Sequence, residues 1–152
     1  MTTGIEHEMN FREHWKAWLG IDGNFLQPLD AEDVSLRDPL FLINNRFSLK
    51  YFSAWNWEIY GSLCRKSRFP TMKELYSERL RRNIPNPDLK YERSLNLEVG
   101  WRWTSSKGFI KSIFFQNYLT DHIVNVQVGD GIQQYQNLGQ VLSRGWEVTL
   151  QN

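Results

Sequence analysis

The histidines are the side chains whose type most readily suggests metal chemistry. His7-Glu8 and His14 would suit a zinc protease only as part of His-Glu-x-x-His, which places both imidazoles on one face of a helix. Here the two histidines are seven residues apart, on segments that alternate like strands and would point them oppositely. We therefore expect no metal at these positions.

Two groups of carboxylates could in principle act on a ligand. Glu6 and Glu8 share one face of a predicted strand, where paired carboxylates can perform acid–base chemistry, but a solvated pair is the simpler interpretation. A second group lacks the spacing and the glycine of an EF-hand calcium loop, so we interpret it as a solvated acidic loop. Its members are Asp30, Glu32, Asp33 and Asp38.

The lone cysteine and a basic run complete the reactive side chains. Cys64 lies near Arg65 and Lys66, which would favour a reactive thiolate, but no histidine motif accompanies it, so an ordinary strand residue is the better interpretation. The run Glu78-Arg79-Leu80-Arg81-Arg82 is interpreted as solvated loop charge. The sequence therefore predicts no enzyme, no catalytic residue, no metal site and no cofactor.

Composition narrows the class of protein. The chain has 152 residues, enough for one domain, and 18 basic against 17 acidic residues leave a formal charge of +1, which gives no argument for nucleic acid. One cysteine excludes an internal disulfide. No run of eighteen apolar residues is present, and the first residues lack the features of an export signal. Either the chain is cytoplasmic or Met1 is not the natural start.

The stretch from Leu95 to Trp103 shows the clearest periodicity in the chain. Every odd position is apolar, and the even positions hold Asn96, Glu98, Gly100 and Arg102. This period of two predicts a strand with two unlike faces. A second run over 109–119 follows the polar break 104–108, so the pair predicts a hairpin with strands about ten residues long. That is about twice the usual length in soluble domains and close to what a tilted membrane strand needs.

The same alternation predicts strands over 5–11, 15–25, 42–53, 57–68 and 137–150. Short breaks near 13–14, 54–56 and 104–108 alternate with long connections over 27–39, 69–91 and 120–134. Helical spacing of Met72, Leu75, Tyr76 and Leu80 predicts a turn or two of helix in the second long connection. The sequence thus predicts an all-β fold: an antiparallel up-and-down meander of about seven long strands, forming an open segment of a transmembrane β-barrel.

Five of the seven tryptophans cluster at the short breaks. They are Trp15, Trp55, Trp57, Trp101 and Trp103. Because an indole ring favours the boundary between lipid and water, a row of them at one level predicts an aromatic girdle. Filling of a soluble core is the alternative, but it does not explain their crowding at one end.

The polar positions of the strands would line a hydrated interior and pair with one another across strands. They are Lys16, Asp22, Asn24, Lys50, Glu58, Asn96, Glu98 and Arg102. Ligand contacts are expected in the long loops 27–41 and 69–91. No ligand-binding residue can be assigned there.

Three motifs resemble a known family, and their order and spacing fit it. Arg68-Phe69-Pro70-Thr71-Met72-Lys73-Glu74-Leu75-Tyr76 resembles the segment after a mid-barrel strand in TonB-dependent outer-membrane receptors. Asn86-Pro87-Asp88-Leu89-Lys90-Tyr91-Glu92-Arg93-Ser94 resembles that family's Asn-Pro-Asp-Leu-Lys-Pro-Glu-Arg-Ser motif, with Tyr91 in place of proline. The tail, Tyr135-Gln136-Asn137-Leu138-Gly139 followed by Arg144-Gly145-Trp146-Glu147, resembles the family's Asn-x-Gly and Arg-Gly-x-Glu-Leu-Glu strand.

The resemblance implies a fragment from the C-terminal half of the receptor barrel, located in the cell outer membrane. Implied partners are outer-membrane lipid, a plug domain, the periplasmic protein TonB, and a scarce bulky nutrient such as a siderophore, haem, cobalamin or a glycan. Residues 1–152 are expected to be partial barrel, without plug domain, signal peptide or terminal strand. Since such receptors have about 22 strands, we expect no transport by this piece alone.

A small soluble β-barrel that binds an apolar ligand is the competing hypothesis. Alternation alone cannot distinguish the two, because turning the sheet inside out exchanges core for lipid face without changing the pattern. The location of Leu95 and Val99 decides between them: exposed on an open sheet, or packed inside a sealed body.

Overall fold

The computed structural model describes residues 2–27, 38–78 and 82–152. Within these ranges, eight strands form one sheet and a single short helix lies in a connection. The elements are β1 (Thr2–Phe11), β2 (Trp15–Leu26), β3 (Leu40–Phe52), β4 (Trp57–Arg68), α1 (Met72–Tyr76), β5 (Asn83–Ile84), β6 (Glu92–Ser105), β7 (Gly108–Gly129) and β8 (Ile132–Gln151).

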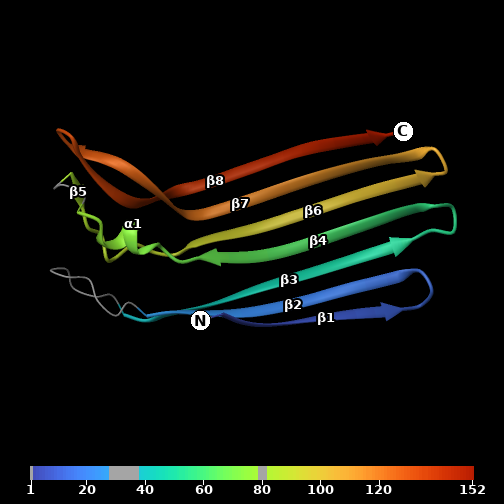
Figure 1. Ribbon diagram of the computed structural model, residues 1–152, viewed down its shortest axis with the longest axis horizontal. Helices are drawn as coiled ribbons and strands as arrows, with labels where there is room; N and C mark the ends of the chain where they lie inside the picture. The colour runs from blue at the N-terminus through green and yellow to red at the C-terminus, as the bar shows by residue number, and fades with distance from the viewer. Residues whose placement is uncertain (1, 28–37, 79–81) are drawn as a thin grey trace.

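The strand order is that of a meander. It runs β1-β2-β3-β4-β6-β7-β8-β5, with antiparallel neighbours throughout except for the two-residue β5, which pairs in parallel with β8. Figure 1 shows the long strands side by side in an open sheet, with tight turns at one end and α1 and β5 at the other. The predicted all-β, open, up-and-down arrangement is confirmed.

Strand register keeps like side chains on the same side of the sheet. Ile59 lies opposite Trp101, Gly61 opposite Val99 and Leu63 opposite Leu97. We call this side the outer face, and the side that carries Lys50, Glu58 and Glu98 the polar face. Side chains of the outer face have no packed layer over them within the described residues: Leu95 is 45% and Val99 47% exposed. The sealed core that a soluble barrel would require is therefore not formed around them.

Aromatic rings form a row along the outer face at the tight-turn end. The ring centroids of Trp15 and Tyr51 are 4.9 Å apart, those of Tyr51 and Trp57 5.8 Å, and those of Phe11 and Trp15 6.3 Å. These rings come from four consecutive strands, so they are at one level across β1 to β4. We call this set the aromatic row. It contains two of the five clustered tryptophans, Trp15 and Trp57, and Trp103 lies opposite Trp57 on β6.

The third long connection was predicted wrongly. Residues 120–134 do not form a loop, because β7 and β8 continue through them to a tight turn at Asp130. The ribbon instead bends where Asp121 (φ 55°) faces Gly139 (φ 49°) in left-handed conformations. These residues interrupt the pairing between Thr120–Gln140 and His122–Leu138. We call this bend the kink. Glycine and aspartate tolerate that backbone conformation better than branched residues do.

Helix α1 confirms the predicted turn of helix, although Leu80 lies outside the described residues. Thr71 and Glu74 form a capping box at its start, in which each side chain satisfies a backbone N–H of the other residue. Within the described parts of the chain, no helix is long and apolar enough to span a bilayer.

Candidate functional site

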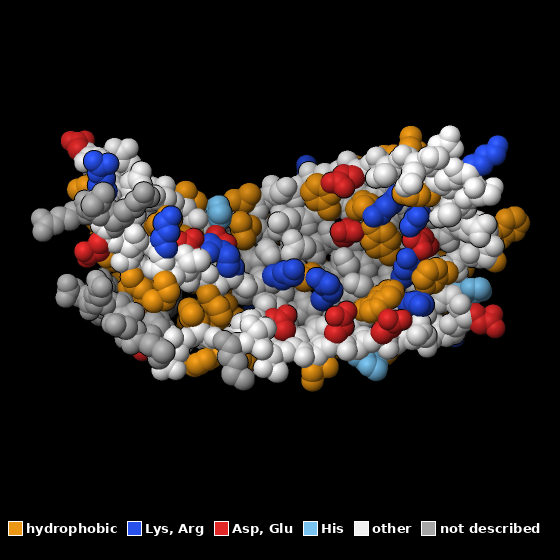
Figure 2. Space-filling view, in the orientation of Figure 1, with side chains coloured by type: hydrophobic (Ala, Val, Ile, Leu, Met, Phe, Trp, Pro, Cys, Tyr) orange, Lys and Arg blue, Asp and Glu red, His pale blue; other side chains and the backbone are white. Residues whose placement is uncertain are grey.

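The polar face carries charged side chains that are paired across neighbouring strands. Lys50 Nζ lies 2.7 Å from Glu58 Oε2. Tyr60 donates a hydrogen bond of 2.8 Å to Glu98. The Asp22 carboxylate accepts hydrogen bonds from Asn24 (2.6 Å) and from its neighbour on β3, Asn44 (2.8 Å). The predicted cross-strand pairing is confirmed for Lys50 with Glu58, and Figure 2 shows charges of both signs gathered on the face in view.

A hollow of about 800 Å³ opens on the polar face between β3 and β8. Its lining is mixed in charge and rich in hydroxyl and amide groups, including Arg46, Ser62, Lys66, Asn96, Glu98 and Glu147. Within the described residues, the buried Oδ1 of Asn117, which also lines it, has no hydrogen-bond partner. Such a surface suits contact with water or with a polar partner, since buried polar atoms are normally hydrogen-bonded.

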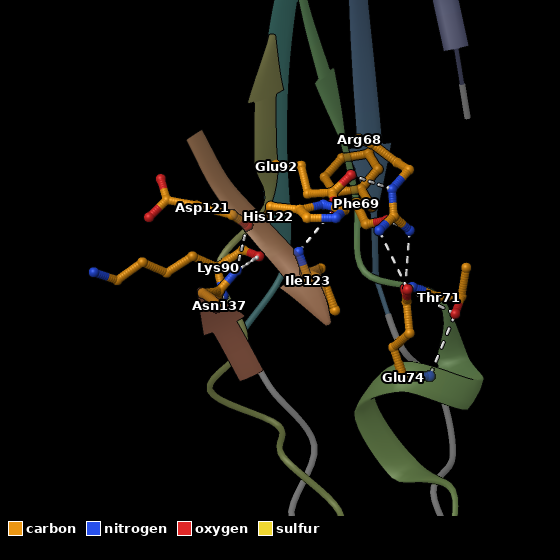
Figure 3. Close-up of polar contacts among 10 residues, drawn as sticks. All are labelled: Arg68, Phe69, Thr71, Glu74, Lys90, Glu92, Asp121, His122, Ile123 and Asn137. Carbon is orange, nitrogen blue, oxygen red and sulfur yellow. Dashed lines mark hydrogen bonds and ion pairs between the residues drawn. The ribbon is translucent and has the colours of Figure 1, made fainter. Parts of the chain in front are cut away.

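Glu92 is the first residue of β6 and joins three strands at the end of the sheet that carries α1 and β5. We call this end, opposite the tight turns, the loop end. Glu92 accepts hydrogen bonds from Arg68 Nε (2.7 Å) and the backbone N–H of Ile123 (2.8 Å), and its other contact is with His122 Nδ1 (2.8 Å). Figure 3 shows these groups converging from β4, β6 and β7. We call this cluster of Arg68, Glu74, Glu92 and His122 the junction.

The junction holds its carboxylates in the charged form. Burial alone would raise the pKa of Glu92, but the hydrogen bonds from Arg68, the Ile123 N–H and His122 outweigh it and lower the pKa from 4.5 to about 2. The same competition leaves the pKa of Glu74 below its usual range, through bonds from Arg68 and Thr71. Hydrogen bonds to both carboxylates raise the pKa of Arg68, so all three groups remain ionised near neutrality.

Helix α1 is tied to the strands through the same arginine. Arg68 Nη1 and Nη2 donate to the two carboxylate oxygens of Glu74 at 2.9 and 3.2 Å. Glu74 is also the residue that caps α1 by accepting from the Thr71 N–H at 2.7 Å. One guanidinium therefore connects the end of β4, the first turn of α1 and the start of β6, a bidentate geometry that lysine cannot reproduce.

Asn137 fastens the loop before β6 to the kink. Its side-chain oxygen accepts from the Lys90 N–H (2.7 Å), while its amide group donates to the carbonyls of Lys90 (3.0 Å) and Asp121 (2.7 Å). Beside it, Leu75, Leu89 and Ile123 form the apolar cluster of the loop end. The loop end is thus a small folded unit with its own core, built from segments far apart in the sequence.

The other reactive side chains of the sequence do not come together. His7 is on β1 opposite Leu19, and His14 is in the turn before β2, against the ring of Tyr51. Across residues 2–27, 38–78 and 82–152, no group of three or more His, Cys, Asp or Glu side chains is placed to hold a metal. Cys64 is buried on the polar face, beside Arg46 and Lys66 at the hollow.

The structure describes the predicted Glu6 and Glu8 pair but only part of the predicted acidic loop. Glu6 and Glu8 are on one strand, β1, and Glu8 contacts Lys16 Nζ at 3.6 Å and accepts from Trp18 Nε1 at 3.1 Å. The interaction with Trp18 explains why a tryptophan occupies the polar face. Asp30, Glu32, Asp33, Arg79 and Arg81 lie outside the described residues.

Sequence reasoning missed the junction and Asn137. Glu92 belongs to the Asn86–Ser94 motif and Arg68 begins the motif before it, so the motifs themselves were a signal. Nothing in the spacing of His122 pointed to a partner thirty residues earlier.

An open antiparallel meander with an exposed apolar face, a charged opposite face and a one-ended aromatic row has the features of an outer-membrane β-barrel wall. The family model for the TonB dependent receptor-like β-barrel matches residues 4–152. The chain therefore belongs to the TonB-dependent receptor β-barrel family, whose members are outer-membrane transporters and receptors.

Solved structures of this class have the same fold. The siderophore receptor PirA from Pseudomonas aeruginosa superposes with a TM-score of 0.79 at 16% identity, covering 98% of this chain and 27% of that one. The hemophore receptor HasR from Serratia marcescens, solved with its hemophore and heme, gives 0.76 at 16% identity, covering 98% and 31%. The copper transporter OprC gives 0.76 at 16% identity, covering 97% and 25%.

This chain thus spans between a quarter and a third of the length of those three receptors. No curated protein sequence matches it.

Proposed function

We propose that this chain forms part of the wall of a TonB-dependent outer-membrane receptor that imports a scarce, bulky, metal-containing nutrient. The observation that supports the proposal most strongly is the family match over residues 4–152 on a sheet whose outer face is exposed and apolar. In this proposal the outer face contacts lipid, while the polar face lines the barrel interior, where it meets the plug domain and the ligand. Further strands complete the barrel.

The two ends of the sheet suggest its orientation. In outer-membrane barrels, short turns lie on the periplasmic side and long loops outside the cell. The tight turns and the aromatic row would then lie at the periplasmic boundary, and the junction outside. TonB would deliver the energy of the inner-membrane proton-motive force from the periplasmic side.

The loop end offers a surface that suits an anionic metal chelate. A hollow of about 490 Å³ is lined by Lys73, Arg82, Asn125, Gln133 and Tyr135, which provide two cations and several hydrogen-bonding groups. Among the structurally similar proteins, one is a siderophore receptor and another was solved with heme. A ferric siderophore or haem is therefore our proposed cargo, ahead of cobalamin or a glycan.

Uptake in cells tests the cargo and the energy source. The receptor that contains this wall is expected to restore uptake of a ferric siderophore or haem to a strain lacking its own receptors, and to do so only with TonB present. Lys73→Glu with Arg82→Glu should weaken uptake, whereas Lys107→Glu, at the opposite end, should not. Uptake that persists without TonB would contradict the proposal. Cells producing residues 1–152 alone should show none.

Labelling of adjacent cysteines tests the assignment of the two faces. In a Cys64→Ser background, Val148→Cys lies on the outer face and Thr149→Cys on the polar face of the same strand, opposite Ser112 and Lys111 respectively. A membrane-impermeant maleimide should label position 149 and leave 148 unlabelled in membranes. Equal labelling at both positions would refute a lipid-facing outer face.

A further inference from the structure

Gly61 leaves a depression in the outer face. Its cross-strand neighbours are Leu49 and Val99, and Ile59 and Leu63 precede and follow it on the same side of β4. Four large apolar side chains therefore surround a position without a side chain. The result is a groove of about 650 Å³ that reaches from the aromatic row, at Trp15, Tyr51 and Trp57, to mid-strand. No charged side chain lines it.

The backbone does not require glycine at this position. Gly61 is not among the glycines with positive φ, and a Cβ there would meet only the Glu98 carbonyl oxygen, at the ordinary contact distance of 3.8 Å. β-Strands disfavour glycine, because it loses more conformational entropy and packs nothing. The small residue is therefore explained by the space it leaves, and not by the conformation it allows.

Three other strand glycines show how an aromatic ring of the same chain can fill such a space. A Cβ on Gly100 would lie 2.6 Å from the Tyr60 ring, one on Gly145 2.6 Å from the Phe115 ring, and one on Gly23 3.1 Å from the Phe41 ring. At each of these positions an aromatic side chain of the same chain covers the glycine. Gly61 has no such cover among the described residues. The groove is thus a similar depression whose occupant comes from outside.

We propose that the groove at Gly61 binds one acyl chain of a membrane phospholipid from the leaflet at the tight-turn end. This inference rests on the proposed function, because it requires the outer face to meet lipid. An apolar groove offers water no hydrogen bonds, and an empty one forfeits dispersion contacts on all its walls. The groove is continuous with the exposed outer face, whose surrounding medium is then acyl chain.

The aromatic row fixes how that lipid would lie. Indole and phenol rings favour the level of the headgroups, so the open end of the groove at Trp15 and Trp57 coincides with the polar end of the phospholipid. The chain would extend past Ile59 and Gly61 toward Leu63, with its length along β4. A side chain of a second protein would have to reach the same groove through the surrounding lipid.

Methyl NMR on the receptor that contains this wall, reconstituted in phospholipid nanodiscs, tests this inference, because the completed barrel leaves no open sheet edge in lipid. The readout is the nuclear Overhauser effect between lipid acyl protons and methyl groups of Leu, Ile and Val. The methyl groups of Leu49, Leu63 and Val99 should show acyl cross-relaxation several-fold stronger than that of the Val148 and Leu150 methyl groups. The latter two residues lie on the outer face of β8, away from the groove. Gly61→Leu should lower the groove signals to the level of Val148. Val148→Leu, which adds bulk outside the groove, should leave them unchanged.

The experiment distinguishes failure of the acyl-chain site from failure of the proposed function. The acyl site would be overturned if the cross-relaxation of the groove methyls were no stronger than that of Val148, or if Gly61→Leu left it unchanged. Either result would leave the proposal of a lipid-facing wall intact. Absence of acyl contacts at both sets would overturn the proposed function and the site together, and protein contacts at the groove would assign it to a second copy. Should Gly61→Leu fail to insert, Gly61→Ala, whose Cβ makes only ordinary contact, must still lower the groove signals partially.

Discussion

The junction and the outer face are built on opposite principles within one sheet. At the junction, Glu92 alone accepts from an arginine and a backbone N–H and contacts a histidine, and Leu75 and Leu89 beside it are fully buried. On the outer face, backbone ladders hold long strands in register while Leu97 and Val99 stay exposed. The side chains of the junction form hydrogen bonds and ion pairs within the chain, whereas the apolar side chains of the outer face remain exposed to the surrounding medium.

This difference teaches which medium each region needs. A partly exposed polar network such as the junction is stable next to water, because its charged groups pair with one another. A sheet with an exposed apolar face gains stability only when a second apolar phase covers it. We therefore expect changes at the outer face to act on insertion of the whole sheet, and changes at the junction to act locally.

The largest effect should follow a charge on the outer face. Leu97→Arg is expected to cost about 2–4 kcal/mol of folding free energy in lipid vesicles, the range for cations near mid-membrane in barrels. Urea titration monitored by tryptophan fluorescence measures it. The matched control is Ser62→Arg, which places the same charge beside Glu98 on the polar face and should cost far less. Equal costs on both faces would remove the distinction between them.

Removal of the amide at Asn137 should loosen the loop end without releasing the sheet. Asn137→Ala eliminates three hydrogen bonds to Lys90 and Asp121, a loss of about 2 kcal/mol of local stability. Hydrogen exchange measures it at the amides of Lys90 and Ile123, which should exchange faster while those of β3 do not change. Asn125→Ala, at the hairpin tip, is the control. Global unfolding of the variant would contradict the separation of the two regions.

The junction should respond to acid, with a definite sign. The pKa of Glu92 is lowered on folding from 4.5 to about 2, so its contribution is complete above pH 4.5 and disappears as pH falls toward 2. Since Arg68 is 44% exposed and water screens the pair, we expect a loss of about 1–2 kcal/mol. Limited proteolysis of the loop end across this range measures it. Glu92→Gln should be weakened at pH 7 already and lack the acid-dependent step.

The smallest effect should come from a surface ion pair next to the junction. Arg93 Nη2 lies 2.6 Å from Asp121 Oδ2, with side chains 44% and 23% exposed. Arg93→Gln should change stability by less than about 1 kcal/mol, because exposed pairs contribute little. The same exchange measurement applies, repeated at high salt, where wild type and variant should converge. A change as large as that of Asn137→Ala would place Arg93 inside the junction network.

The sheet was predictable from sequence because each strand carries its own signal. Alternation from Leu95 to Trp103 defines two faces without knowledge of any partner strand, and register in the structure preserves it. The extension of β7 was missed although Val124, Val126 and Val128 alternate with polar residues. Gly129 and Gly131 indicate a loop by their composition, but in the structure they form the tight turn of a hairpin.

The contacts of the loop end, including the junction, were less predictable because the residues that they join are remote in sequence. Arg68 is 24 residues from Glu92, and Asn86 is 49 residues from Tyr135, whose carbonyl it contacts. Single-sequence patterns describe neighbours within a turn or a strand, and such contacts depend on strand order and on the kink. The groove was predictable in part. The sequence shows Gly61 among apolar residues, but whether the space beside it is covered depends on how β3 and β6 pack next to β4.

The kink has a consequence for how this wall can diversify. The pairing of β7 with β8 is interrupted after Thr120 and Gln140, and the hairpin arm beyond, 122–138, lies beside β5 at the loop end. Residues added or exchanged in that arm do not change which face of the sheet each side chain of the other strands lies on. Insertion or deletion at the tip of the arm can therefore change the surface of the loop end, while strands β1 to β4 and β6 keep their outer and polar faces.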